Sequence, residues 1–122
     1  MSKRVLIVDD ESCFCEITKY SLEKAGYETF IAYNGQEAMS MLREVKPHIM
    51  LLDLNMPIMD GHEVCRLVRS DDEFKDLPII LVTAIDRDIV AAKVKEKWAN
   101  DYVIKPFDYD VLFEKMNNLI EY

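Results

Sequence analysis

The sequence has few of the features that would mark a membrane-bound, secreted or repetitive protein. No apolar run approaches the roughly 20 residues needed to span a bilayer. The apolar stretch at residues 5–8 is short and is followed by acids, so it does not resemble a signal peptide. Repeats, low-complexity tracts and linkers rich in Pro, Gly or Ser are also absent. We therefore expect a cytoplasmic protein that folds as a single domain over residues 1–122.

Cysteine and positive charge are both scarce. The three cysteines, Cys13, Cys15 and Cys65, are odd in number and match neither a zinc site nor a redox pair. We interpret them as thiols without chemistry. Fifteen Lys and Arg residues against 23 Asp and Glu residues give a net charge of −8. This charge repels nucleic acid and anionic membranes, and it agrees better with a cation ligand or a basic protein partner.

What the sequence does contain is an alternation of strand-like apolar runs and helical patterns. The runs cover residues 5–8, 29–33, 48–52, 79–83 and 102–104. Several are apolar without interruption, as expected of strands that are covered on both faces. Five strand-then-helix units in a row predict an α/β fold with one parallel sheet and helices on both of its faces.

Helix ends can be located from capping residues. Gly26 stands where a left-handed cap would end the first helix. Asn34, with Glu37 three residues later, predicts a capping box at the start of the second helix, and Asp108 predicts the N-cap of the fifth. The apolar stripe that we expect the first helix to bury consists of Phe14, Ile17, Ser21 and Ala25.

Polar residues follow the ends of four of these strands. Asp9 and Asp10 come after the first strand, Asp53 comes after the third, Thr83 ends the fourth, and Lys105 follows the fifth. Ligands of open α/β sheets bind beyond the carboxyl ends of the strands. Side chains that lie far apart in the sequence are therefore expected to converge on one pocket.

Three carboxylates close together repel each other, so either some take up protons or a hard cation lies among them. Mg²⁺ suits the second outcome, because it accepts carboxylate and carbonyl oxygens and also coordinates phosphate. Lys105 supplies a positive charge for an anion, and the Thr83 hydroxyl can donate a hydrogen bond to it. An aspartate can act as a nucleophile that forms an aspartyl-phosphate. The pattern thus indicates phosphoryl transfer to Asp53, with charge neutralisation by Mg²⁺ and Lys105.

Four motifs occur in a fixed order: "VLIVDDE" at residues 5–11, "LLDLNMPIMDG" at 51–61, "PIILVTA" at 78–84 and "NDYVIKPF" at 100–107. With these motifs the sequence resembles the receiver domain of two-component response regulators, essentially from end to end. Each motif alone is weak, but four in this order are very specific. The resemblance implies a flavodoxin-like sheet with the strand order 2-1-3-4-5.

The resemblance implies a role for each acid. Asp53 would accept a phosphoryl group from a histidine kinase or a histidine phosphotransfer protein. Asp10 would bind Mg²⁺ directly and Asp9 largely through water, and the backbone carbonyl of Asn55 would complete the protein ligands beside Asp53. Lys105 matches the lysine of the family that contacts the phosphoryl group.

The resemblance also implies a switch. The bond from Lys105 to Pro106 would be cis, which is an isomer that X-Pro bonds adopt at modest cost. The Thr83 hydroxyl would move onto a phosphoryl oxygen and the Tyr102 ring would turn inward. This biases a face formed by the fourth helix, the fifth strand and the fifth helix.

A downstream protein, or an output domain outside this sequence, would read that face. The chain would be a signalling phosphoacceptor that assists its own phosphorylation and dephosphorylation without separate substrate turnover. It would be a monomer or a weak dimer through the output face. Whether it acts alone or as part of a longer protein stays open.

Two positions depart from the family pattern or tune it. The family commonly has Gly just before the fourth motif, where the fourth helix ends in a left-handed turn, but this chain has Trp98. That helix end must therefore close differently, and Trp98 either packs under the helix or stands exposed as an anchor for a partner. Ile85, together with Asn55, lies where the family tunes its dephosphorylation rate. A bulky apolar group at Ile85 should hinder an attacking water.

Three other functions are alternatives to a phosphoaccepting receiver. A flavin-binding protein of the same architecture needs a phosphate-binding loop after the first strand, but the loop "DDESCF" repels phosphate. An aspartate-nucleophile, Mg²⁺-dependent phosphohydrolase typically has a second Asp two residues after the first, and this chain has Asn55 there. The third alternative is a receiver-like module that binds partners without phosphorylation, and the complete set of Asp10, Asp53, Thr83 and Lys105 argues against it.

Overall fold

A computed structural model describes residues 2–120, which contain one five-stranded parallel sheet. The strands are β1 (Arg4–Val8), β2 (Glu28–Ala32), β3 (Ile49–Leu52), β4 (Ile79–Thr83) and β5 (Asp101–Ile104). They lie in the order β2-β1-β3-β4-β5, as the resemblance implied. Each observed strand overlaps the run predicted for it, and the ends differ by at most one residue.

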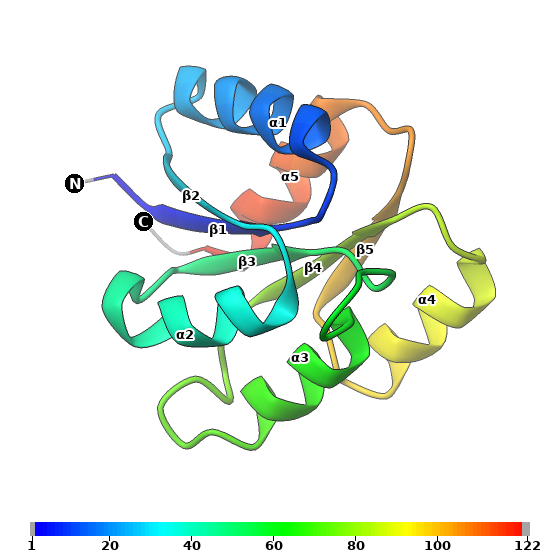
Figure 1. Cartoon of the computed structure of the whole chain (residues 1–122). Coiled ribbons are helices and arrows are strands. Elements are labelled where there is room, and N and C mark those ends of the chain that lie inside the picture. Colours follow the sequence, from blue (N-terminus) through cyan, green and yellow to red (C-terminus); the bar gives the residue numbers. More distant parts are fainter. Residues whose placement is uncertain (1, 121–122) are drawn as a thin grey trace.

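Helices cover both faces of this sheet (Figure 1). They are α1 (Ser12–Lys24), α2 (Gly35–Val45), α3 (Gly61–Arg69), α4 (Arg87–Lys95) and α5 (Tyr109–Leu119). One core cluster lies between the sheet and α2, α3 and α4, and the other lies between the sheet and α1 and α5. Within residues 2–120, none of these helices is both long and apolar enough to pass through a bilayer.

The predicted caps position the helices as expected. The Asn34 side chain accepts a hydrogen bond from the Glu37 backbone N–H at 2.9 Å, and the Glu37 carboxylate accepts one from the Tyr33 N–H at 3.0 Å. Asp108 caps α5 through the Asp110 N–H at 2.9 Å. Gly26 follows the end of α1 with a φ of 99°, a conformation that glycine adopts without steric cost.

The predicted buried face of α1 is wrong in part, because Ile17 and Ala25 are exposed whereas Phe14 and Ser21 are half-buried. Ile17 is 58% exposed, whereas Cys15, Thr18 and Leu22 form the buried stripe. The predicted stripe left out the buried Leu22, and the buried face also includes a thiol and a threonine hydroxyl. The hydroxyl of Thr18 tolerates burial because it lies 2.8 Å from the hydroxyl of Tyr109 at the start of α5.

The end of α4 closes differently from the family pattern, as expected, and the residue that closes it is Lys97. Lys97 has a φ of 69°, and its N–H donates to the carbonyl of Val94 while the Trp98 N–H donates to the carbonyl of Lys93. A non-glycine residue therefore takes the left-handed position. Trp98 is partly buried against the core, and its carbonyl accepts a hydrogen bond from Arg69 at 3.1 Å.

We expect the Thr18–Tyr109 hydrogen bond to hold α1 against α5. Tyr109→Phe leaves the buried Thr18 hydroxyl without this partner and should lower the free energy of unfolding by about 1 kcal/mol. The double variant Thr18→Val with Tyr109→Phe should lose less than the sum of the two single losses. Urea denaturation of the four proteins measures this coupling, and strictly additive losses would contradict it.

Candidate functional site: an acidic pocket at the carboxyl edge of the sheet

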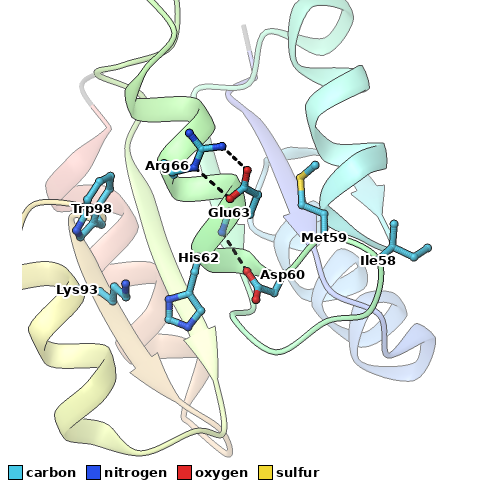
Figure 2. Close-up of a pocket in the computed structure, with 8 residues that line it drawn as sticks. All are labelled: Ile58, Met59, Asp60, His62, Glu63, Arg66, Lys93 and Trp98. Carbon is cyan, nitrogen blue, oxygen red and sulfur yellow. Dashed lines mark hydrogen bonds and ion pairs between the residues drawn. The ribbon is translucent and has the colours of Figure 1, made fainter.

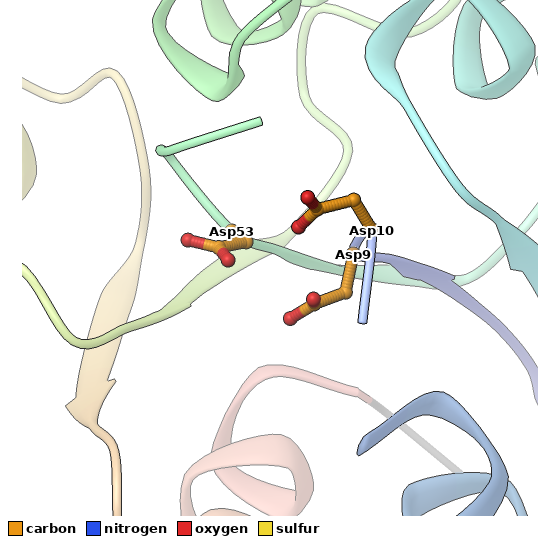
Figure 3. A group of neighbouring side chains, drawn as sticks. All are labelled: Asp9, Asp10 and Asp53. Carbon is orange, nitrogen blue, oxygen red and sulfur yellow. The ribbon is translucent and has the colours of Figure 1, made fainter. Parts of the chain in front are cut away.

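The structure brings the three predicted acids together. Asp9 and Asp10 follow β1 and Asp53 follows β3, and these two strands are neighbours in the sheet. One carboxylate oxygen from each of the three side chains lies within 4.8 Å of the others (Figure 3). The strand order reverses between β1 and β3, so the cluster lies where open α/β sheets bind ligands.

Backbone pairing fixes the positions of these acids. The Asp53 N–H donates to the Val8 carbonyl at 3.0 Å, and the Asp9 N–H donates to the Ala32 carbonyl at 3.1 Å. Both acids therefore continue the ladder of the sheet by one residue. The Asp53 side chain is buried, and its Oδ1 accepts a hydrogen bond from the Asn55 N–H at 3.1 Å. Asp10 is exposed, unlike the buried Asp9 and Asp53.

Lys105 reaches this cluster from the end of β5. Its Nζ lies 2.7 Å from Oδ2 of Asp9 and 3.6 Å from Oδ2 of Asp53. A third carboxylate, that of Glu11, lies 3.0 Å from the same Nζ. The Lys105–Pro106 peptide bond is cis.

Burial and ion pairing act against each other in this pocket. Burial raises the pKa of Asp9, although the hydrogen bond from Lys105 opposes that rise. Burial, the largest single cause, would lower the pKa of Lys105. The hydrogen bonds to Asp9 and Glu11, together with the negative charges of Asp9 and Asp53, outweigh burial, so the pKa is raised. Lys105 therefore stays positively charged. Burial disfavours the ionised form of Asp9, and a further cation near this carboxylate would stabilise that form.

Thr83 and Tyr102 lie on the side of the sheet that α4 covers. Thr83 ends β4 and is fully buried, and its hydroxyl accepts a hydrogen bond from the Ile85 N–H at 3.5 Å. In the β4–β5 register Tyr102 is opposite Leu81, two residues before Thr83. Its ring is half-buried against the same core cluster, and the Lys115 ammonium lies 5.8 Å from the ring centre.

Two groups that touch Lys105 were not among the predicted site residues. Glu11 directly follows Asp9 and Asp10 in the sequence, so its place at the pocket could have been read from "DDE". The Phe14 ring lies 4.1 Å from the Lys105 ammonium, measured to the ring centre. Phe14 was expected to be part of a helix stripe, and no motif indicated that it faces a cation.

A separate groove lies between α3 and α4 (Figure 2). Its volume is about 560 Å³, and it is lined by Ile58, Met59, Asp60, His62, Glu63, Arg66, Lys93 and Trp98. The two acids in it are already engaged, because Asp60 caps α3 through the Glu63 N–H and the Glu63 carboxylate pairs with Arg66. None of the clustered acids lines this groove, so the acidic pocket is the stronger candidate for chemistry.

Comparison with known proteins agrees with this geometry. The family model described as the response regulator receiver domain matches residues 5–117. The chain belongs to this family. Receiver domains are signalling phosphoacceptors of two-component systems that bind Mg²⁺ at an acidic pocket and interact with histidine kinases or phosphotransfer proteins.

Three solved structures illustrate the relationship. The chemotaxis protein CheY4 of Vibrio cholerae is 28% identical, with 98% of this chain and 100% of that chain covered and a TM-score of 0.90. The response regulator TrrA of Thermotoga maritima, in complex with Mg²⁺–BeF, is 36% identical with 97% and 99% covered and a TM-score of 0.85. A receiver domain of a histidine kinase from Syntrophus aciditrophicus is 31% identical with 97% and 89% covered and a TM-score of 0.87.

The family match does not favour the other functions considered from the sequence. The phosphohydrolase and the phosphorylation-independent module are both weaker descriptions of a chain that belongs to the receiver family. The sheet order and the acidic pocket are those expected of a receiver. A flavin site is also disfavoured, because the loop after β1 carries the acids of the pocket.

Gly61 is expected to be essential for the position of Asp53. A Cβ at Gly61 would overlap the Asp53 carbonyl oxygen and would lie 2.7 Å from the Leu54 Cα. Gly61→Ala should therefore displace the Asp53 backbone, lower the free energy of unfolding by about 2 kcal/mol, and reduce uptake of a phosphoryl group from acetyl phosphate.

Gly26→Ala is the matched control, since its Cβ would meet nothing within 4 Å and the strain comes only from the φ of 99°. It should lower the free energy of unfolding by about 1 kcal/mol and leave phosphoryl uptake unchanged. Denaturation and intact-mass measurements on both variants test this. Normal uptake in Gly61→Ala would show that the close contact does not position Asp53.

Proposed function

We propose that Asp53 of this receiver domain accepts a phosphoryl group from a phosphohistidine of a histidine kinase or a histidine phosphotransfer protein. The observation that carries the proposal is the convergence of Asp9, Asp10 and Asp53 with the ammonium of Lys105 at one edge of the sheet. Asp53 is the acid that follows β3, the central strand of the sheet. Oδ2 of its buried side chain lies 3.6 Å from Nζ of Lys105.

The residues fit a magnesium ion. Mg²⁺ prefers oxygen ligands and keeps several waters, and the pocket offers one carboxylate oxygen from each of Asp9, Asp10 and Asp53 within 4.8 Å. The backbone carbonyl of Asn55, in the exposed loop after β3, is proposed as the remaining protein ligand. When bound, Mg²⁺ supplies positive charge that offsets the repulsion among the carboxylates and the phosphoryl oxygens.

The transfer itself needs no additional base. Asp53 is a carboxylate whose oxygen attacks phosphorus, and the O–P bond forms as the P–N bond of phosphohistidine breaks. The imidazole nitrogen keeps the bonding electron pair and takes up a proton. The Lys105 ammonium lies on the same side of the pocket and neutralises charge on the transferred group.

The switch is proposed to run through Thr83 and Tyr102. The Thr83 hydroxyl accepts a hydrogen bond from Ile85, so its own proton stays available for a phosphoryl oxygen. Movement of Thr83 opens space on the α4 side of the sheet, where the half-buried Tyr102 ring can turn inward. The α4–β5–α5 face then differs between the two states, and a downstream protein or an attached output domain reads it.

The remaining expectations follow from this role. The chain is proposed to be a cytoplasmic signalling protein without turnover of a separate substrate. A monomer and a weak dimer through the α4–β5–α5 face are both compatible with it.

Intact-mass analysis tests the acceptor. Wild-type protein incubated with acetyl phosphate and Mg²⁺ should gain the mass of one phosphoryl group, as the P–O bond of acetyl phosphate breaks and acetate leaves. EDTA should prevent the gain, and Asp53→Asn should abolish it. Asp108→Asn is a suitable control, because it removes an exposed carboxylate and keeps an α5 N-cap. A gain that survives Asp53→Asn would move the acceptor elsewhere.

The lifetime of the phosphoryl group should depend on Ile85. The Ile85 N–H bonds to Thr83, and its half-buried side chain packs on the α4 side of the core, where a bulky apolar group hinders attacking water. Ile85→Ala and Ile85→Glu should shorten the half-life in Mg²⁺ buffer at least about threefold, a change of about 0.7 kcal/mol in the barrier. Ile17→Ala, on the exposed face of α1, should leave it unchanged. An unchanged half-life in both Ile85 variants would contradict this role.

A further inference from the structure

The ammonium of Lys105 is held from the α1 side of the pocket. Its Nζ hydrogen-bonds to Asp9 at 2.7 Å and to Glu11 at 3.0 Å, and it lies 4.1 Å from the centre of the Phe14 ring. The distance to Asp53 is 3.6 Å, which is an ion pair without a hydrogen bond. An ammonium has three N–H donors. Two are directed to carboxylates, and the face of Phe14 occupies a third direction.

The Glu11 side chain bonds to Lys105 rather than capping α1. Glu11 is the N-cap residue of α1, but its side chain makes no capping hydrogen bond. It turns to Lys105 instead, while 64% of the side chain remains exposed. Asp9, in contrast, is buried and also accepts the Glu11 backbone N–H at 3.0 Å. Of the groups that hold Lys105, Glu11 is therefore the one that can swing away into solvent.

We propose that Glu11 and Phe14 are positioning residues that compete with the phosphorylated Asp53 for Lys105. This inference rests on the proposed acceptor role of Asp53. Before phosphorylation the contacts of Lys105 with Glu11 and Phe14 hold the ammonium at the start of α1, and we call these contacts the tether. A phosphoryl oxygen on Asp53 gains a hydrogen bond from Lys105 when the ammonium gives up one of its α1 contacts, and the exposed Glu11 contact is the one released. The tether lowers the rate of phosphoryl acceptance.

Variants at Glu11 distinguish an effect of the tether on the rate from repulsion between the Glu11 carboxylate and the anionic phosphoryl donor. Glu11→Gln removes the charge, whereas Glu11→Asp keeps the charge and shortens the side chain by one methylene. An Asp at the N-cap is also drawn to the free N–H groups of α1. Release of the tether should raise the maximal rate of phosphoryl uptake from acetyl phosphate about two- to fivefold in both variants, the change expected for an exposed ion pair. Glu16→Gln removes another exposed α1 carboxylate and should behave as wild type.

Phe14→Leu provides a second test of the same tether. It removes the aromatic face over Lys105 and keeps an apolar side chain against the core. It should raise the maximal rate in the same direction as the Glu11 variants. A rate that rises in Glu11→Gln alone, through a lower concentration of acetyl phosphate for half-maximal rate, would show that Glu11 acts only by repelling the anionic donor. A fall in rate in either Glu11 variant would show that Glu11 prepares Lys105 for the reaction, and would overturn the proposal.

A readout without phosphorylation keeps this proposal separate from the acceptor role. In unphosphorylated protein, the Lys105 ammonium should exchange its protons with water more slowly in wild type than in Glu11→Gln and Glu11→Asp, as measured by ¹⁵N-detected NMR of the side chain. Equal exchange in all three proteins would overturn the tether even if Asp53 accepts a phosphoryl group. Slower exchange in wild type together with phosphoryl uptake that survives Asp53→Asn would overturn the acceptor role and leave the tether standing.

Discussion

The pairing of β1 with β3 is the constraint on which the pocket depends. Four residues of each strand align in parallel from Val5 opposite Ile49 to Val8 opposite Leu52, and the Asp53 N–H then bonds to the Val8 carbonyl. Burial of the apolar strand residues stabilises this alignment. The acids are the residues that follow each strand, so the same pairing that forms the core forces their carboxylates together. Their repulsion is a consequence of the sheet.

That repulsion gives the pocket its affinity for positive charge. Burial raises the pKa of Asp9, which means that the folded chain disfavours the ionised form of this side chain. The contribution of Asp9 to stability is therefore largest at low pH and declines as pH rises through its raised pKa. Lys105 compensates part of this cost through its ion pairs with Asp9, Glu11 and Asp53. A divalent cation among the carboxylates relieves more of it, so metal binding is expected to stabilise the fold.

Local sequence signals predicted the strands and the helix caps, but they could not predict side-chain contacts between residues far apart in the sequence. The strands were found because uninterrupted apolar runs have few other uses, and the caps at Asn34 and Asp108 were found because their partners lie within three residues. The buried face of α1 was missed because Thr18 pairs with Tyr109, which lies 91 residues away. The contact of Glu11 with Lys105 spans 94 residues. Motifs placed Lys105 at the pocket, but no periodicity could show which α1 side chains turn toward it.

The side chains proposed to respond to phosphorylation of Asp53 belong to opposite faces of the sheet. Thr83 and Tyr102 lie on the face covered by α4, whereas Phe14 belongs to the face covered by α1 and α5 and holds Lys105 there together with Glu11. In the proposed mechanism, a dianionic phosphoryl group on Asp53 attracts the Thr83 hydroxyl on one side and the Lys105 ammonium on the other. The α4 side carries the half-buried Tyr102 ring, which can repack. On the α1 side, our further proposal has the exposed Glu11 released to water. Phosphorylation of Asp53 can therefore reshape the surface on the α4 side, while the contacts on the α1 side mainly set the rate at which Asp53 is phosphorylated.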